Sequence, residues 1–285
     1  MDHLICLRAT KTSPLCGSTC NNKSYLRFFL EGRSPDFFIE NDYKNANEPR
    51  SGDFFKNYFF IFASNLNTMK IINLSENNSL LNQYLKEIRS VDIQQDPLRF
   101  RRNLERMGEI MAYEISKTLQ YRHEDVVTPL GIAPVNVISN KVVLSTILRA
   151  GLPFHQGFLS YFDRAENAFV SAYRKYKDAL KFEIFIEYIA SPDLNGKVLI
   201  ISDPMLATGA SLELAYGALL TKGRPAMVHI ASVISSQQAV DYLSEHFPEA
   251  NATLWTAAID PTLNAHSYIV PGLGDAGDLA FGEKL

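Results

Sequence analysis

The spacing of apolar residues predicts a long helix that begins near residue 96. Asp96 is a candidate N-cap, and Pro97 stands at the first helical position, where proline is tolerated. Apolar residues then recur at steps of three and four, which is typical of a helix with one buried face. This stripe consists of Leu104, Met107, Met111, Ile115 and Leu119. The pattern therefore predicts an amphipathic helix packed against a core.

Short apolar runs further along the chain predict strands. They cover residues 141–148, 168–173, 182–188, 198–202, 226–233 and 253–258, with helical stretches at about 211–222 and 236–247. Apolar strands separated by helices are typical of a parallel sheet covered on both faces. Residues 183–192 fit an antiparallel arm better than a crossover connection. The predicted fold class is α/β, with one domain.

Residues 1–68 differ from this regular region. Polar, turn-forming clusters interrupt short aromatic runs there, and neither a helical nor an alternating period is sustained. We interpret residues 1–68 as a poorly ordered N-terminal extension and residues 69–285 as the folded domain. Met69 is a candidate translation start, in which case the extension lies upstream of the true start.

Composition restricts the class of protein. Hydrophobic residues make up 46% of the 285 residues and charged residues 21%, which excludes a disordered, collagen-like or coiled-coil chain. A net charge of -3 argues against a broad nucleic-acid surface, which normally carries a basic excess. The apolar runs are all shorter than the roughly 18 residues that a membrane-spanning helix needs.

The positions of the cysteines favour a cytoplasmic location. The three cysteines, Cys6, Cys16 and Cys20, all lie near the N-terminus. The predicted domain therefore holds without disulfides or cysteine-ligated metal, which suits a reducing compartment. The histidines of the domain beyond residue 150 show no paired spacing typical of a metal site, and we interpret them as surface or satisfied core residues. They are His155, His229, His246 and His266.

The strongest chemical signal is the segment 198–211, Val-Leu-Ile-Ile-Ser-Asp-Pro-Met-Leu-Ala-Thr-Gly-Ala-Ser. An apolar strand ends at Asp203, and a short loop leads to Thr-Gly-Ala-Ser at the start of a helix. Helix N-termini bind phosphate through unpaired N–H groups, and Thr208 and Ser211 add hydroxyl donors. Asp203 suits sugar hydroxyls better than phosphate. The combination predicts a sugar-phosphate site, and an ordinary turn capped by Ser211 is the competing interpretation.

Three segments carry a resemblance to a known family. Residues 203–211 resemble the phosphoribosyl-diphosphate signature of phosphoribosyltransferases, and Asp-Pro-Met-Leu-Ala-Thr-Gly resembles the uracil phosphoribosyltransferase family in particular. Residues 147–152, Ile-Leu-Arg-Ala-Gly-Leu, look like the diphosphate-binding strand end of that family. Residues 268–278, Tyr-Ile-Val-Pro-Gly-Leu-Gly-Asp-Ala-Gly-Asp, look like its uracil-binding loop. With residues 256–266 also in register, the resemblance covers about residues 69–285.

The resemblance implies both a fold and an activity. The fold would be the parallel-sheet phosphoribosyltransferase fold with an antiparallel arm and a small C-terminal base-binding hood. The reaction would transfer the phosphoribosyl group of 5-phosphoribosyl 1-diphosphate to uracil, giving UMP and diphosphate in pyrimidine salvage. Mg²⁺ would be held mainly through the diphosphate, and a homodimer or higher homo-oligomer is expected. GTP enters as a candidate effector, although the sequence does not decide whether it activates.

The resemblance also assigns roles to individual residues. Arg149 and Asp203 would be catalytic. The donor-binding residues would be Arg149, Arg174, Asp203, Pro204, Met205, Leu206, Ala207, Thr208, Gly209, Ala210, Ser211 and Asp275. The uracil-binding residues would be Ile269, Gly274, Asp275 and Ala276. Arg149 also follows a predicted strand, where parallel sheets place ligands, and its planar fork suits a diphosphate; a surface arginine in an ion pair is the competing interpretation.

The sequence departs from the family pattern after Arg174. Lys175, Tyr176 and Lys177 stand where acidic residues are expected, so a solvated basic loop competes with the diphosphate role of Arg174. Two other functions compete with the uracil reaction: phosphoribosyl transfer to another base, and RNA binding by a nucleotide-sensing regulator of the same fold. A dinucleotide fingerprint at 272–277 is rejected, because the eight residues after Gly277 cannot complete a helix-and-strand unit.

Overall fold

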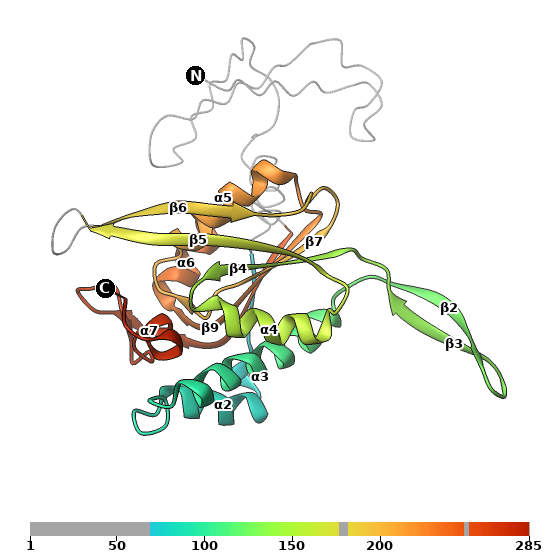
Figure 1. Ribbon diagram of the computed structural model, residues 1–285, viewed down its shortest axis with the longest axis horizontal. Helices are drawn as coiled ribbons and strands as arrows, with labels where there is room; N and C mark the ends of the chain where they lie inside the picture. The colour runs from blue at the N-terminus through green and yellow to red at the C-terminus, as the bar shows by residue number, and fades with distance from the viewer. Residues whose placement is uncertain (1–68, 177–181, 248–250, 285) are drawn as a thin grey trace, which may run out of the picture. The chain divides into compact units, whose positions relative to one another are not determined.

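The computed structural model describes residues 69–176, 182–247 and 251–284, and it describes their side chains outside 172–185 (Figure 1). The expected extension, residues 1–68, lies outside the described residues. The elements are β1 (Lys70–Asn73), α2 (Leu80–Arg89), α3 (Pro97–Ser116), β2 (Tyr121–Thr128), β3 (Gly131–Ile138), β4 (Val142–Leu148), α4 (Gly151–Tyr161), β5 (Glu166–Tyr176), β6 (Phe182–Ala190), β7 (Val198–Ser202), β8 (Met205–Leu206), α5 (Ala210–Leu219), β9 (Met227–Ser236), α6 (Gln237–His246), β10 (Ala252–Asp260), β11 (Thr262–Leu263), β12 (Ile269–Val270) and α7 (Ala276–Phe281).

The central sheet has the strand order β1-β10-β9-β7-β4-β5-β6, and the short strand β8 also pairs with β9. All neighbouring strands are parallel except β5 and β6, which are antiparallel. The α/β prediction and its antiparallel arm are therefore confirmed. Since the carboxyl ends of parallel strands meet at one edge, the segments that follow β4, β7 and β10 emerge on the same side of the molecule.

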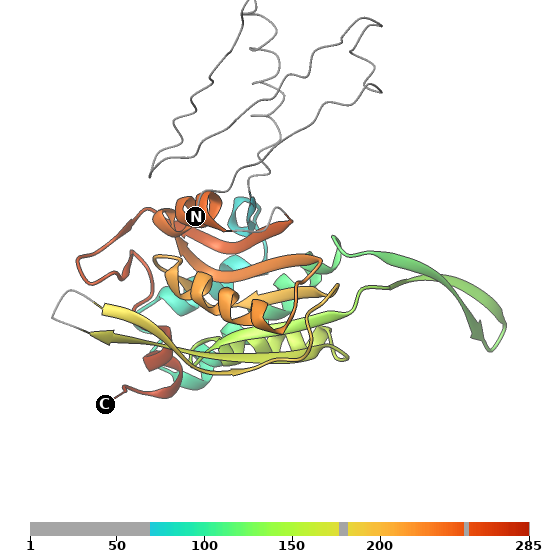
Figure 2. The same cartoon turned by 90° about the horizontal axis from the view of Figure 1, so that it is seen from above.

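Helices cover the two faces of the sheet with separate apolar cores. Helices α2, α3 and α4 pack on one face, and α5 and α6 pack on the other (Figures 1 and 2). The predicted stripe on α3 is fully buried, from Leu104 through Ile115. The helix ends at Ser116, so Leu119 is buried beyond its end rather than within it.

Helix α3 begins where the sequence predicts and lies unusually close to α4. The Asp96 side chain accepts hydrogen bonds from the N–H groups of Leu98 (3.0 Å) and Arg99 (3.2 Å), so it is the N-cap. A Cβ on Gly157 would lie only 2.0 Å from the Glu105 carbonyl oxygen, which makes glycine necessary at this helix contact. The contact fixes α4, and with it the end of β4, against the long helix.

Strands β2 and β3 form a separate hairpin that projects away from the central sheet (Figures 1 and 2). Several of its apolar side chains are exposed, among them Val127 (83% exposed), Leu130 (101%) and Ile132 (70%). Two strands alone are marginally stable in water. Among the residues that the structure describes, no helix is both long and apolar enough to cross a membrane.

Candidate active site

The loop at residues 203–211, here the phosphate loop, connects β7 to α5 and is built into the sheet. The Asp203 N–H donates to the Ala231 carbonyl (3.0 Å), and the Pro204 carbonyl accepts from the Ile234 N–H (3.0 Å). Within the loop, the Asp203 carboxylate accepts from the Met205 N–H (3.2 Å). Main-chain pairing with β9 therefore fixes the position of this loop.

Gly209 forms the turn by which the phosphate loop enters α5. Its φ of 82° lies in the left-handed region, and a Cβ there would lie 3.0 Å from the Tyr242 ring and 3.2 Å from Leu243. Glycine is therefore required for the sharp entry into the helix, and N–H groups at the start of a helix are of the kind that bind anions.

The start of α6 is hydrogen-bonded to the phosphate loop. Ser236 is the N-cap of α6, because its hydroxyl accepts from the Ala239 N–H (2.9 Å). The same hydroxyl donates to the Ala207 carbonyl inside the phosphate loop. One side chain therefore joins α6 to the loop, a role for Ser236 that sequence reasoning missed because no local pattern distinguishes it from other caps.

Arg149 stands at the carboxyl end of β4, beside the phosphate loop. The Thr146 hydroxyl donates to the Ser202 carbonyl (3.1 Å), which ties β4 to β7 just before the two strands end. The guanidinium of Arg149 forms an ion pair with Asp278 (2.8 Å) and donates to the Gly282 carbonyl (3.2 Å). Arg149 thus connects the sheet edge to the C-terminal segment, and its partner Asp278 was not among the predicted site residues.

The segment at residues 268–278, here the base loop, returns to the same edge of the sheet. Ile269 is buried and pairs with Leu263 in the small β11–β12 ribbon. Gly272 (φ 57°) and Gly274 (φ 95°) both adopt the left-handed conformation. The apolar side chains of Ile269 and Ala276 belong to a core cluster against which Met205 and Ala207 of the phosphate loop also pack. Both loops therefore border the same apolar core.

Asp275 caps the short helix α7 that follows the base loop. Its carboxylate accepts from the N–H groups of Gly277 (2.9 Å) and Asp278 (3.0 Å) and lies 3.4 Å from the Lys284 ammonium. Burial alone would raise the pKa of this carboxyl, but the hydrogen bonds and the charge of Lys284 outweigh burial and lower the pKa. Asp275 is thus held as a carboxylate at the site.

The remaining predicted donor residue, Arg174, lies on β5 in the antiparallel arm. Its backbone pairs with Ile184, three positions beyond Ser171, the last residue of β5 that pairs with β4. The strand therefore carries Arg174 past the edge where β4 ends. Its side chain, like that of Lys175, is outside the described residues, and Lys177 lies outside them altogether.

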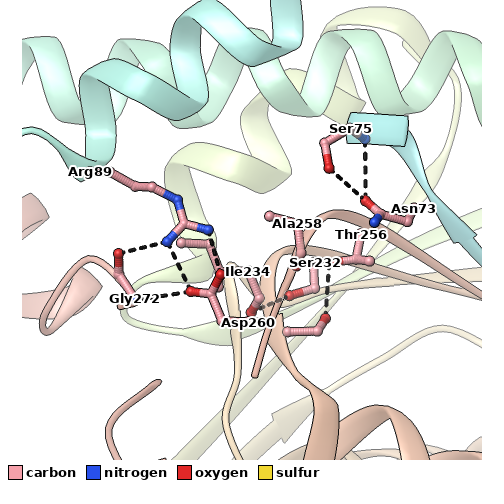
Figure 3. A network of polar contacts seen from close by, with 10 residues as sticks. Asn73, Ser75, Arg89, Ser232, Ile234, Thr256, Ala258, Asp260 and Gly272 are labelled. Atoms are coloured by element: carbon pink, nitrogen blue, oxygen red, sulfur yellow. Dashed lines mark hydrogen bonds and ion pairs between the residues drawn. The ribbon is translucent and has the colours of Figure 1, made fainter. Parts of the chain in front are cut away.

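Two further residues that sequence reasoning missed hold the base loop from outside. Arg89 and Asp260 form a two-fold ion pair, and both contact Gly272 (Figure 3). A weak signal existed for Asp260, because it is an acid at the carboxyl end of a strand. Arg89 ends a helix that the apolar pattern did not identify, so its sequence context gave no indication of this contact.

The described histidines and acids were also compared with the sequence prediction of core histidines and no metal site. His155 is bonded to Asn167 (2.8 Å), as expected of a satisfied core residue. His229 is buried, and its Nδ1 accepts from the Trp255 indole N–H (3.1 Å), while its Nε2 has no hydrogen-bond partner among the described residues. Within the same described ranges, no group of three or more His, Cys, Asp or Glu side chains could hold a metal ion.

Comparisons with known proteins agree on one family. The sequence model of the family described as uracil phosphoribosyltransferase matches residues 75–283. A uracil phosphoribosyltransferase of Porphyromonas gingivalis is 68% identical over 217 residues, which cover 76% of this chain and 100% of that protein. One of Methanothermobacter thermautotrophicus is 40% identical over 207 residues, covering 72% of this chain and 93% of its own length. The solved structure of the AQ2163 protein from Aquifex aeolicus is similar with a TM-score of 0.67 and 30% identity, covering 74% of this chain and 98% of that one.

Proposed function

The chain belongs to the uracil phosphoribosyltransferase family, and on this premise we propose which of its residues carry the reaction. The protein is an enzyme that transfers the phosphoribosyl group of 5-phosphoribosyl 1-diphosphate to uracil, forming UMP and diphosphate in pyrimidine salvage. The assignment of residues is carried by one observation: the phosphate loop, Arg149 and the base loop meet at the carboxyl edge of one sheet.

The donor would lie across the ends of β4 and β7. Its 5-phosphate would bind at the start of α5, where the backbone of residues 208–211 and the hydroxyls of Thr208 and Ser211 offer donors. The Asp203 carboxylate would accept hydrogen bonds from the ribose hydroxyls. Arg149 and Arg174 would bind the diphosphate. The other phosphate-loop residues, Pro204, Met205, Leu206, Ala207, Gly209 and Ala210, would line this half of the site.

The reaction requires positioning and charge stabilisation rather than a covalent enzyme intermediate. As the bond between ribose C1 and the diphosphate breaks, the ribose ring gains cationic character, and N1 of uracil forms the new bond while its proton is released. The Arg149 guanidinium stabilises the charge that develops on the leaving diphosphate, and Asp203 holds the ribose and favours the cationic ring. Holding N1 in line with C1 then supplies much of the acceleration.

Mg²⁺ would reach the site with the donor. The described residues include no group of three or more His, Cys, Asp or Glu side chains that could hold a metal ion by itself, and Mg²⁺ is usually bound by one or two carboxylates together with substrate phosphates and water. This donor set fits an ion that the diphosphate carries. The ion would supply charge neutralisation on the leaving group.

The base loop would recognise uracil mainly through its backbone. Ile269, Gly274, Asp275 and Ala276 are the proposed contacts, and Asp275 would also touch the donor. Uracil presents two carbonyl acceptors and N–H donors, which main-chain groups can match. Since the Asp275 carboxylate already caps α7, we assign its base contact to the main chain. A main-chain N–H facing the 4-carbonyl would reject cytosine, whose amino group would leave that donor unpaired.

Two substitutions test the proposed roles in an assay of UMP formation from uracil, the donor and Mg²⁺. Asp203→Asn and Arg149→Ala should each lower kcat/KM by about 100- to 1,000-fold, since each removes a group that stabilises transition-state charge. Asp193→Asn and Arg164→Ala, both at exposed positions away from the site, are the matched controls and should retain activity. Full turnover in either site variant would contradict its role, and a panel of other bases would expose a different base preference.

We propose that residues 69–285 form the phosphoribosyltransferase domain and that 1–68 are an extension. The proposal is supported by the Porphyromonas gingivalis relative, whose whole length aligns over 217 residues of this chain. Mass spectrometry of protein made from the native gene tests the alternative start at Met69. An N-terminus upstream of Met69 would contradict that start.

The exposed hairpin supports a homodimer or higher homo-oligomer, with a second copy of the chain as the partner. Val127, Leu130 and Ile132 expose apolar surface on a two-stranded element that water stabilises poorly. A double variant with Val127→Ser and Ile132→Ser should be shifted toward the monomer in sedimentation velocity. An unchanged sedimentation coefficient would contradict a role for the hairpin in assembly.

Two further proposals concern an effector and the cellular location. GTP as an effector rests on the family resemblance, and UMP formation measured with and without GTP tests it. A cytoplasmic location rests on the placement of Cys6, Cys16 and Cys20 near the N-terminus. Fractionation of cells that express the native gene tests the location.

A further inference from the structure

We propose that Arg89 and Asp260 are positioning residues for uracil, because they clamp the base loop in the conformation that its backbone needs to meet the base. The inference rests on the proposed role of residues 268–278 as the base loop. Neither residue lies in that loop: Arg89 ends α2, and Asp260 ends β10.

The clamp holds both polar groups of one loop residue. The Arg89 guanidinium lies 2.7 Å and 2.9 Å from the two carboxylate oxygens of Asp260, in the two-fold arrangement that suits this pair. The Gly272 N–H donates to Asp260 (2.9 Å), and the Gly272 carbonyl accepts from Arg89 (3.0 Å). Figure 3 shows the three residues as a closed set of contacts.

Gly272 is the point at which such a clamp sets the shape of the loop. It lies between Ile269 and Gly274, the first two proposed uracil contacts. Its φ of 57° is left-handed, and a Cβ there would lie 2.1 Å from the Ile269 carbonyl oxygen. The backbone therefore turns back sharply on Ile269. Fixing Gly272 on both sides fixes the spacing between Ile269 and the glycine-rich half of the loop.

Burial makes the loss of either member of the Arg89–Asp260 pair costly. The Asp260 side chain is only 6% exposed and that of Arg89 23%, so removal of one member leaves the other largely buried without its counter-charge. Neighbouring side chains hold the same segment further on. The Arg101 guanidinium donates to the Ala280 carbonyl (2.6 Å), and the Gln94 amide, oriented to satisfy its neighbours, donates to the Leu273 carbonyl (2.8 Å). Of these contacts, the clamp is the one that holds both the N–H and the carbonyl of a single residue between the proposed base contacts Ile269 and Gly274.

Steady-state kinetics separate positioning from general support of the fold. Arg89→Met and Asp260→Asn should each raise KM for uracil by about 10- to 100-fold, as expected for the loss of hydrogen bonds to a charged partner. KM for the donor should stay within about twofold, because the phosphate loop is held by β9 instead. The double variant should be no worse than either single one, since both act through the same pair.

A matched control breaks a comparable ion pair that also involves α2. The Arg99 guanidinium donates to the Glu87 carboxylate (2.8 Å) between α3 and α2, and the other side-chain hydrogen bonds of Glu87 among the described residues go to Gln83 and Asn103 on the same two helices. Arg99→Met should leave both KM values unchanged within about twofold even if it lowers the melting temperature. Arg89→Lys keeps the charge but loses the fork, so its KM for uracil should lie between those of the wild type and Arg89→Met.

The outcomes distinguish the clamp from the base loop itself. If Gly274→Ala raises KM for uracil but Arg89→Met and Asp260→Asn do not, the clamp is wrong and the base loop stands. If all three leave KM for uracil unchanged, the base-loop assignment fails, and the clamp with it. Equal rises in the two KM values would identify the pair as general support and overturn positioning. Should a single variant not fold, the double variant, which removes the unpaired charge, and Arg89→Lys decide by the same criteria.

Discussion

The phosphate loop is tied to the central sheet by main-chain pairing, whereas Gly272 in the base loop is held by side chains from two other elements, α2 and β10. Pro204 and Met205 are hydrogen-bonded into the strand system through β9. Gly272, by contrast, depends on Arg89 and Asp260, which precede it by 183 and 12 positions. The two loops of the active site are therefore held by different interactions: main-chain hydrogen bonds in one case and a side-chain ion pair in the other.

This difference implies unequal freedom to move. Opening the phosphate loop would disrupt ladder hydrogen bonds next to a fully buried strand, so it should require opening of the sheet. The base loop can loosen through loss of one ion pair while β10 and α2 remain intact. Substitutions that leave Arg149, Asp275 and Asp278 in place should therefore affect donor binding through the sheet and uracil binding through side-chain anchors.

As the pH falls, the sheet that carries the phosphate loop should lose stability at a higher pH than the helix pair α2–α3. Burial lowers the pKa of His229 on β9 to about 4, compared with 6.5 in an unfolded chain. Between these values the unfolded state binds the proton and the folded state does not, so stability is fully present above pH 6.5 and is lost as the pH falls toward 4. The loss should approach about 3 kcal/mol.

Melting temperatures between pH 7.5 and 4.5 measure this effect. His229→Gln, which keeps an acceptor for the Trp255 indole, should flatten the pH dependence, whereas His246→Gln at an exposed helix end should not. An unchanged slope in His229→Gln would remove His229 as the cause. The helix pair responds at lower pH: hydrogen bonds from Arg99 and Asn103 lower the pKa of Glu87 to about 2, so its contribution is lost only as the pH falls from about 4.5 to 2.

Gly274→Ala separates the base loop from the phosphate loop by strain alone. A Cβ at Gly274 would meet only the Leu279 side chain, at 4.0 Å, but the φ of 95° is unfavourable for alanine. The cost of about 1–2 kcal/mol corresponds to a rise of about 5- to 30-fold in KM for uracil, with KM for the donor unchanged. Gly217→Ala, on α5 with open space around it, is the control and should affect neither KM. A rise in KM for the donor instead would contradict the assignment of the loop to the base.

The sequence predicted the elements around the phosphate loop better than the contacts that hold the base loop, for a physical reason. The phosphate loop is encoded locally, as the predicted strand 198–202 matches β7 and the following helix begins at Ala210. The start of α3 was also readable, because Asp96 and Pro97 are local signals, whereas its end at Ser116 was not, since the apolar stripe continues to Leu119. Contacts such as Arg89 with Asp260 join positions 171 residues apart, and no local pattern encodes them.

Two missed elements illustrate the same limit. The pattern did not predict α4, because Gly151, Pro153 and Gly157 weaken its helical character; Gly157 is required by the close contact with α3 rather than by the helix itself. The β2–β3 hairpin was missed because its apolar residues face outward in this chain and do not build its core. The roles of Arg149 and Asp275 stay predictions, although the structure adds their partners Asp278 and Lys284.

Ser236→Ala should have the smallest effect and should change KM for only one of the two substrates. The substitution removes the N-cap of α6 and the hydrogen bond to the Ala207 carbonyl, at a cost of about 1 kcal/mol, which corresponds to a rise of roughly fivefold in KM for the donor. KM for uracil should not change, since the Ser236 hydroxyl that is removed bonds only the phosphate loop and α6 among the described residues, whereas the pairing of its backbone with Asp260 is kept. Ser244→Ala removes a hydroxyl that bonds within α6, to the Val240 carbonyl (2.7 Å), and should leave both KM values as they are. If Ser236→Ala raised both KM values equally, the two loops would share their support, and the separation between a sheet-held and a side-chain-held half would be wrong.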